Sequence, residues 1–161
     1  NYGGGMRASQ DAIKYNCKDV LWLDAQEHKY VEEIGTSNAF FKIDGEVITA
    51  PLDSGTILPG ITRDSVIQLL KKWGVPVSER KLSIDEIEEA SKNGKLEEIF
   101  ASGTAAVISP IGTLCVQGED YTVGDGNVGP LAQKLYDNIY GMQTGKVEDY
   151  MGWVYPLGLK A

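Results

Sequence analysis

The hydrophobic pattern of the first fifty residues changes from helical spacing to strand spacing. Apolar residues recur at helical intervals over 7–16, and a short continuous apolar run follows at 20–23. β-branched and aromatic residues then dominate 30–43 and 46–49, with the turn signal Asp44-Gly45 between them. This half of the chain therefore predicts a helix, a buried strand and two paired strands.

Helical spacing returns in the second half of the chain. We expect four helices there: one opened by 59–62 and ended by Gly74, one opened by the capping box 83–86 and ended near 93–94, a short one running to Phe100, and one marked by Leu131, Leu135 and Ile139. Strand patterns lie between and after them, at 105–111, 114–116, 121–123 and 153–155.

No internal repeat, low-complexity tract or linker divides these elements, so residues 1–161 are expected to form one domain. The mixture predicts the α/β (mixed α+β) class, with a curved mixed sheet or pseudo-barrel and flanking helices. A continuous core is expected to include Trp22, Phe40, Leu69, Trp73 and Ile108.

Charge and composition exclude several classes of function. The chain has 23 acidic and 15 basic residues, for a formal net charge of -8, and its lysines and arginines do not cluster. Nucleic acid is therefore not an expected partner. The sequence contains neither an apolar run long enough to span a bilayer nor a signal-peptide pattern, which predicts a cytoplasmic protein without membrane association.

The usual reactive residues are scarce. Cys17 and Cys115 show no metal or redox spacing and are interpreted as core thiols, so no metal site is expected. The single histidine, His28, lies in a polar stretch typical of a solvated turn rather than of a catalytic base.

Two segments place polar groups where a bound anion or a buried charge is plausible. Residues 58–63 put a glycine and the Thr62 hydroxyl at a helix start, where free N–H groups and the helix dipole favour a phosphate; plain helix capping is the alternative. In 32–41, Glu33 interrupts a strand pattern. A buried carboxylate there needs a partner, whereas an exposed strand residue needs none.

Two further segments indicate a binding site only when they are considered together with the first two. Residues 102–106, Ser-Gly-Thr-Ala-Ala, lie between a predicted helix and a predicted strand, where consecutive N–H groups can hold a second anion or simply make a turn. The opening Asn1-Tyr2-Gly3-Gly4 taken alone is typical of a flexible end, and its glycines indicate a loop that has been interrupted.

In this order and spacing, the four segments resemble the branched-chain amino acid aminotransferases, which are fold-type IV pyridoxal phosphate enzymes. The resemblance extends through 20–23 to Trp153. It implies that residues 1–161 are the large C-terminal, cofactor-binding domain of such an enzyme, whose fold-type relatives include D-amino acid aminotransferases and aminodeoxychorismate lyases.

The resemblance also implies roles for individual residues. Tyr2 would contact the phenolic oxygen of pyridoxal 5'-phosphate, and Glu33 would face the ring nitrogen and keep it protonated. The residues expected to hold the phosphate or to lie beside the cofactor are Thr36, Leu58, Gly60, Ile61, Thr62 and Thr104. Thr104 and Ala105 would receive the substrate carboxylate through their amides.

Two departures from the family pattern stand out. The lysine that binds the cofactor would lie a few residues before Asn1, and Lys14 is not a suitable substitute. We therefore expect no catalytic residue in 1–161, no small N-terminal domain and no activity from this stretch alone. The redox CxxC of some animal relatives is replaced by Ala106-Val107-Ile108-Ser109, which excludes thiol regulation at that place.

The resemblance implies that the intact protein is a homodimer that transfers the amino group of leucine, isoleucine or valine to 2-oxoglutarate. Within the same fold, D-amino acid aminotransferase and aminodeoxychorismate lyase are the alternatives, although 33–41 and 58–63 favour the branched-chain enzyme. A non-catalytic domain that binds phosphate or a metabolite is the alternative from another class.

Overall fold

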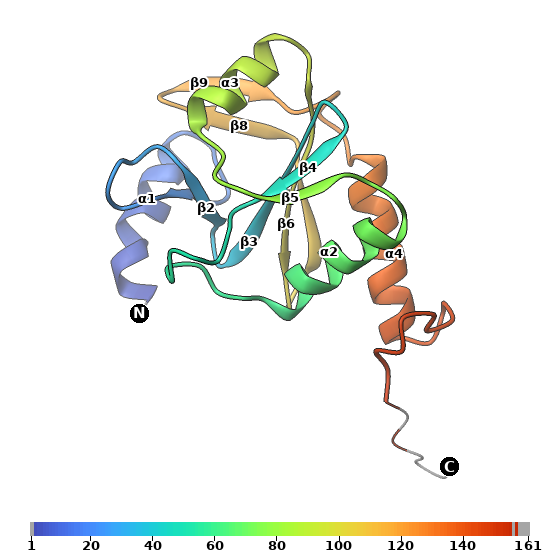
Figure 1. Cartoon of the computed structure of the whole chain (residues 1–161). Coiled ribbons are helices and arrows are strands. Elements are labelled where there is room, and N and C mark those ends of the chain that lie inside the picture. The colour runs from blue at the N-terminus through green and yellow to red at the C-terminus, as the bar shows by residue number, and fades with distance from the viewer. Residues whose placement is uncertain (1, 156, 158–161) are drawn as a thin grey trace.

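A seven-stranded mixed sheet forms the centre of the computed structural model, which describes residues 2–155 and 157 (Figure 1). Its strands are β1 (Leu21–Leu23), β2 (Val31–Ile34), β3 (Ser37–Ile43), β4 (Glu46–Thr49), β5 (Val77–Glu79), β6 (Leu96–Gly103) and β7 (Val107–Ile111). Strands β8 (Thr113–Val116) and β9 (Glu119–Thr122) form a separate hairpin. The helices are η1 (Tyr2–Gly5), α1 (Met6–Lys14), α2 (Ile61–Lys72), α3 (Ile84–Lys92) and α4 (Pro130–Gln143).

The sheet has a fork along one side of its central strand, β3. On its other side β3 pairs with β6 in antiparallel fashion. On the forked side, Ser37 and Asn38 pair with β2, whereas Phe40–Ile43 pair with β4. Between these two ladders, the Ala39 carbonyl accepts a hydrogen bond from Oγ1 of Thr49 at 2.7 Å. Strands β2 and β4 thus part beside Asn38.

Two apolar clusters cover the two faces of this sheet, because successive strand residues point to opposite sides. Phe40 belongs to the cluster under α2 and α4, where its ring stacks on Phe100 with centroids 5.1 Å apart. Phe41 belongs to the cluster under α3. Figure 1 shows α2 and α4 side by side, with α3 on the other side of the sheet. The predicted single core is therefore wrong: the sheet separates two.

The predicted core residues divide accordingly. Phe40, Leu69 and Ile108 are buried in the cluster under α2 and α4, as expected. Trp73 only packs against the edge of that cluster, and Trp22 is half-buried outside both clusters. The large indole rings cover the margins of the core rather than fill it.

The predicted helix ending at Phe100 is wrong, since these residues begin β6. Leu96, Glu97 and Glu98 favour helices intrinsically, but β6 lies between β3 and β7 and hydrogen-bonds to both. Pairing on two sides outweighs local propensity. Residues 102–106 consequently join two strands, β6 and β7, and not a helix and a strand.

The boundaries of other elements also differ from the predicted ones. Residues 30–43 form two strands and not one, because a two-residue turn at Gly35 and Thr36 reverses the chain. Strand β5 was not predicted, and 153–155 form no strand. The N-cap half of the predicted capping box is confirmed, since Ser83 Oγ accepts from the Glu86 N–H at 3.1 Å, whereas the Glu86 carboxylate accepts from Arg80.

The cysteines and the histidine lie near the surface. Cys17 and Cys115 are half-buried and free, so their interpretation as core thiols is wrong. His28 is exposed in the loop before β2, as predicted. Within the described part of the chain, no helix combines the length and apolarity needed to cross a membrane.

Candidate active site

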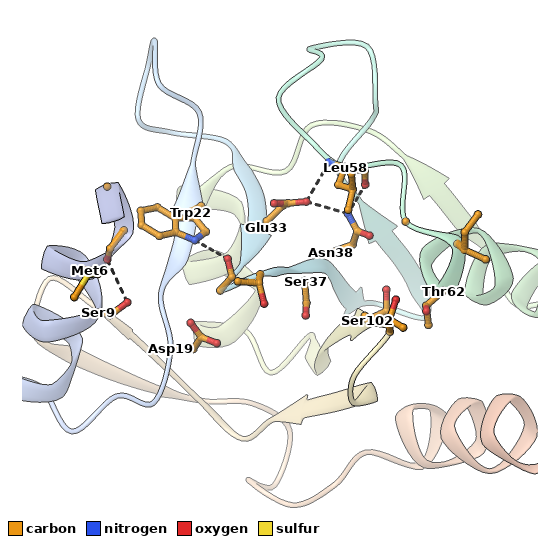
Figure 2. A pocket seen from close by; sticks show the side chains of 18 of the residues that line it. Met6, Ser9, Asp19, Trp22, Glu33, Ser37, Asn38, Leu58, Thr62 and Ser102 are labelled. Carbon is orange, nitrogen blue, oxygen red and sulfur yellow. Dashed lines mark hydrogen bonds between the residues drawn. The ribbon is translucent and has the colours of Figure 1, made fainter. Parts of the chain in front are cut away.

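A cavity of about 870 Å³ opens beside the fork of the sheet, on the face that α2 covers. Five stretches line it: η1 with α1, β1 with the residues before it, the β2–β3 hairpin, the segment that enters α2, and the end of β6 with the turn after it. Figure 2 shows side chains from these separate stretches pointing toward one space. The cavity therefore assembles polar groups that lie up to about a hundred positions apart in the sequence.

A row of three polar side chains crosses the sheet at this cavity. Glu33 on β2 lies opposite Asn38 on β3, and Asn38 lies opposite Ser102 on β6. Cross-strand neighbours point to the same face, so all three belong to the face that carries Phe40 and Phe100. Asn38 and Ser102 are 5% and 1% exposed, which is unusual for polar side chains without a function or a partner.

The tight β2–β3 turn brings this row together. Gly35 adopts φ +57°, and a Cβ at this position would overlap the Asp19 carboxylate. Trp22 Nε1 donates to the Gly35 carbonyl at 2.9 Å and holds the indole ring at the wall of the cavity. Only glycine tolerates both the positive φ and the close approach of Asp19. The resulting two-residue turn places Glu33 directly opposite Asn38.

Glu33 is held by two donors to one of its oxygens. Oε1 accepts from the Leu58 N–H and from Asn38 Nδ2, each at 3.2 Å. Burial raises the pKa of the Glu33 carboxyl, the Leu58 N–H lowers it, and the negative charge of Glu32 raises it further. Oε2 has no hydrogen-bond partner among the described residues. A cationic or N–H partner in the cavity would compensate for this burial.

The start of α2 supplies an anion site. Gly60 is the N-cap in extended conformation, and its carbonyl accepts from the Asp64 N–H at 3.0 Å. The N–H groups of the first turn have no partner within the helix, and Ile61 and Thr62 face the cavity. Gly60 lies so close to Asn38 that a Cβ would overlap its Oδ1.

Arg63, in the first turn of α2, does not line the cavity. Arg63 is 3% exposed, and its Nη2 donates to the Ala50 carbonyl and to Glu79 Oε2, both at 2.8 Å. Arg63 therefore ties the first turn of α2 to the end of β4 and to β5. Among the described residues that line the cavity, the charged groups are Asp19 and Glu33, with no lysine, arginine or histidine.

The β6–β7 turn closes the far end of the cavity. Gly103 and Thr104 line it, and Val107 leaves the turn with φ +61°, a strained conformation for a β-branched residue. The Ser102 Oγ is buried without a hydrogen-bond partner in the described structure. An unpaired buried hydroxyl is costly, so packing alone does not explain a serine at this position.

Most of the predicted site residues come together in this cavity. Seven of the nine line it: Glu33, Thr36, Leu58, Gly60, Ile61, Thr62 and Thr104. Ala105 is exposed in the adjacent turn and does not contribute to the lining. The predicted role of Tyr2 concerns a side chain outside the described part of the structure.

Several lining residues were not predicted: Asp19, Trp22, Asn38 and Ser102. A pairing signal existed for Asn38, because Gly35 in a turn places it opposite Glu33. The position of Ser102 depends on β6 being a strand, and the predicted helix at that place concealed it.

The fold and the cavity define a class of protein. The cavity combines a helix N-terminus that suits an anion, a carboxylate held beside the segment that enters this helix, and a mixed sheet behind both. Residues 1–114 match the family model described as amino-transferase class IV. The chain belongs to the class IV aminotransferases.

Curated proteins with similar sequences are branched-chain aminotransferases. The chain is 54% identical over 153 residues to branched-chain-amino-acid aminotransferase 2 of Bacillus subtilis (strain 168), covering 95% of this chain and 42% of that protein. It is 48% identical, again over 153 residues, to branched-chain-amino-acid transaminase 1 of the same strain, covering 43% of that protein. The chain thus spans less than half the length of these curated relatives.

Solved structures agree in fold. The branched-chain amino acid aminotransferase from Escherichia coli superposes with a TM-score of 0.76 at 34% identity, covering 95% of this chain and 46% of that one. The branched-chain amino acid aminotransferase of T.th., in a complex with N-(5'-phosphopyridoxyl)-L-glutamate, gives 0.75 at 30% identity, covering 96% and 48%. Both likenesses extend over almost the whole of this chain.

Proposed function

We propose that residues 1–161 form the cofactor-binding domain of a pyridoxal 5'-phosphate-dependent aminotransferase that acts on leucine, isoleucine and valine with 2-oxoglutarate. One observation carries the proposal: Glu33 and the start of α2 face the same cavity. Support comes from the curated relatives named for this activity and from neighbours solved with phosphopyridoxyl-glutamate and with pyridoxamine 5'-phosphate.

The residues present fit this cofactor. The unpaired N–H groups at the start of α2 and the Thr62 hydroxyl suit a phosphate. Ser102 lines the same cavity, and Gly60 has no Cβ that would overlap Asn38 at the helix start. The Glu33 carboxylate, half-buried with Oε2 unpaired among the described residues, suits a ring N–H. Bound pyridoxal phosphate supplies a ring that withdraws electrons from the substrate.

In this proposal, residues of this chain bind the cofactor and favour the protonated form of its ring. Glu33 holds a proton on the ring nitrogen, since a nearby carboxylate favours the cationic form. Leu58, Thr36 and Thr104 line the cavity, where Leu58 would pack beside the ring, Thr36 would lie at the same wall and Thr104 would contact the phosphate. The N–H groups of Thr104 and Ala105 orient the substrate carboxylate, for which the exposed turn is accessible.

The proton-transferring lysine must come from elsewhere in the intact protein. No lysine lines the cavity in the described structure, and Lys14 is ion-paired to Asp11 with 72% of its side chain exposed. We place this lysine before Asn1, and the phenol role of Tyr2 belongs to the same proposal. A homodimer and a cytoplasmic location are part of the same proposal.

The test is an assay of the full-length protein with pyridoxal phosphate and 2-oxoglutarate. We expect glutamate to form with L-leucine, L-isoleucine and L-valine, and not with D-alanine. Glutamate formation from D-alanine in place of the branched-chain donors would favour a D-amino acid aminotransferase, and pyruvate release from aminodeoxychorismate would favour the lyase. Cofactor binding without any of these reactions would favour a non-catalytic binding domain.

A further inference from the structure

We propose that Asn38 is a positioning residue that joins the carboxylate end of the cavity to its phosphate end. Its amide favours the ionised form of Glu33 and fixes the position of this carboxylate relative to the start of α2. The inference deepens the proposed function and rests on it for the identity of the bound group. The contacts that carry it belong to the chain itself.

Both protons of the Asn38 amide are used. Nδ2 donates to Glu33 Oε1 at 3.2 Å and to the Leu58 carbonyl at 2.9 Å. Two acceptors around one nitrogen settle the orientation of the amide, because the reverse orientation would place an oxygen against both. The neighbouring Leu58 N–H donates to the same Glu33 oxygen, also at 3.2 Å. Glu33, Asn38 and Leu58 therefore close a small ring of hydrogen bonds (Figure 2).

The place of Asn38 in the sheet explains why this ring forms. Asn38 is the last residue of β3 that pairs with β2, just before β3 turns to β4 as its partner. The segment Leu58–Gly60 fills the opening between the two strands. Asn38 contacts this segment twice, by its bond to Leu58 and by the close approach of Oδ1 to Gly60. One buried side chain thus sets both the carboxylate and the entry to the helix.

Geometry gives this amide an electrostatic effect. Donors to a carboxylate favour its charged form, which opposes the effect of burial on Glu33. The other charged groups near Glu33 are Glu32 on β2 and Asp19 before β1, and both carry the same sign. With no cation among the described residues of the cavity, the Asn38 and Leu58 donors are the groups that favour the ionised form of Glu33 against the effect of burial.

The experiment follows the Glu33 carboxyl by ¹³C NMR in the full-length protein without cofactor, with its signal assigned by its loss in Glu33→Gln. Asn38→Leu keeps the branched shape of the side chain and removes both donors. We expect the pKa of Glu33 to rise by about 1 unit or more in this variant. Thr49→Val is the control: it removes a buried side-chain hydrogen bond to the same strand, β3, at a residue that does not line the cavity, and it should leave that pKa unchanged.

A second measurement needs no variant of Asn38. In the wild type, the side-chain N–H signals of Asn38 should shift with the titration of Glu33 and stop doing so in Glu33→Gln. An unchanged Glu33 pKa in folded Asn38→Leu, or Asn38 signals that ignore Glu33, would overturn the inference. Both readouts use the cofactor-free protein, so they stand or fall separately from the proposed activity.

The cofactor-bound protein gives a third readout. Asn38→Leu should lower kcat more than it changes KM, and it should move the acid limb of the kcat–pH profile upward. A merely structural role would lower the melting temperature and leave the profile in place, which would contradict the inference. Thr49→Val, the control, should lower the melting temperature and leave the kcat–pH profile in place.

Discussion

Glu98 and Leu131 are joined across 33 positions of sequence: the Leu131 N–H donates to Glu98 Oε1 at 3.0 Å, and the next N–H, of Ala132, donates to Oε2 at 2.9 Å. Glu98 is 4% exposed, with Lys42 Nζ 3.9 Å away. A Cβ at Gly129 would overlap the carboxylate. A charged side chain of β6 thus caps α4 and docks it on the sheet.

Glu98→Gln should therefore destabilise the protein. An amide presents one acceptor oxygen where the carboxylate presents two, and it brings an NH₂ group against a helix N-terminus. We expect the free energy of unfolding to fall by about 1 to 3 kcal/mol, measured by urea denaturation. Glu148→Gln, an exposed carboxylate with no side-chain hydrogen bond in the described structure, is the control and should change it little. Equal stability of the two variants would mean that the cap contributes nothing.

Thr62→Ala should weaken the binding of pyridoxal phosphate to the full-length protein. Its hydroxyl lies at the helix start in the cavity, and a bond to a charged phosphate contributes about 1 to 2 kcal/mol, or roughly 5- to 30-fold in the dissociation constant. Ser65→Ala one turn later removes a hydroxyl that only bonds the Ile61 carbonyl. Fluorescence titration should show weaker binding for the first variant alone, and the same constant for both would place the phosphate elsewhere.

Glu33→Gln should slow transamination sharply while the cofactor remains bound. A neutral amide cannot keep the ring nitrogen protonated, whereas the phosphate contacts at α2 are untouched. Stopped-flow turnover and equilibrium dialysis of the cofactor separate the two effects. Wild-type turnover in this variant contradicts the assigned role of the carboxylate.

Comparison with Glu33→Gln also tests how the stability of the wild-type protein depends on pH. Burial raises the pKa of Glu33 above its ordinary value, so the folded cofactor-free protein holds this proton more tightly than the unfolded chain. The stability that this proton contributes is complete below the unfolded pKa and is lost as pH rises through the folded pKa. Relative to Glu33→Gln, wild-type stability should fall as pH rises across that window. A difference that is constant with pH, in parallel denaturant titrations, would show that burial leaves this group unperturbed.

Reduction with borohydride in the presence of pyridoxal phosphate should not label residues 1–161 stoichiometrically at any one lysine. No described lysine lines the cavity, and the hydrogen bond to Asp11 raises the pKa of the Lys14 ammonium, which disfavours the nucleophilic amine. We expect this stretch, produced alone, to fold and to show only scattered labelling by peptide mass mapping. A single fully labelled lysine within it would contradict the proposed position of the catalytic lysine.

The sequence predicted the parts of the site that depend on local order. The order Pro59 to Thr62 predicts the start of a helix. Every α-helix has unpaired N–H groups at its start, so this feature follows from the helix itself. Glu33 stood out because a charge within an apolar strand pattern needs an explanation. The family resemblance added the remaining roles, and seven of its nine residues line one cavity.

What the sequence by itself determined is the amphipathic helices, their caps and most of the strands, because these follow from the spacing of neighbouring residues. The tertiary structure alone decided that 96–103 is a strand, since pairing with both β3 and β7 outweighs helical propensity. It also decided that Glu33, Asn38 and Ser102 form one row, because register between strands is set by turns and by packing on both faces of the sheet. Hydrogen bonds between such distant positions leave no periodic trace in the sequence, and the Asn38 link is therefore visible only in the folded chain.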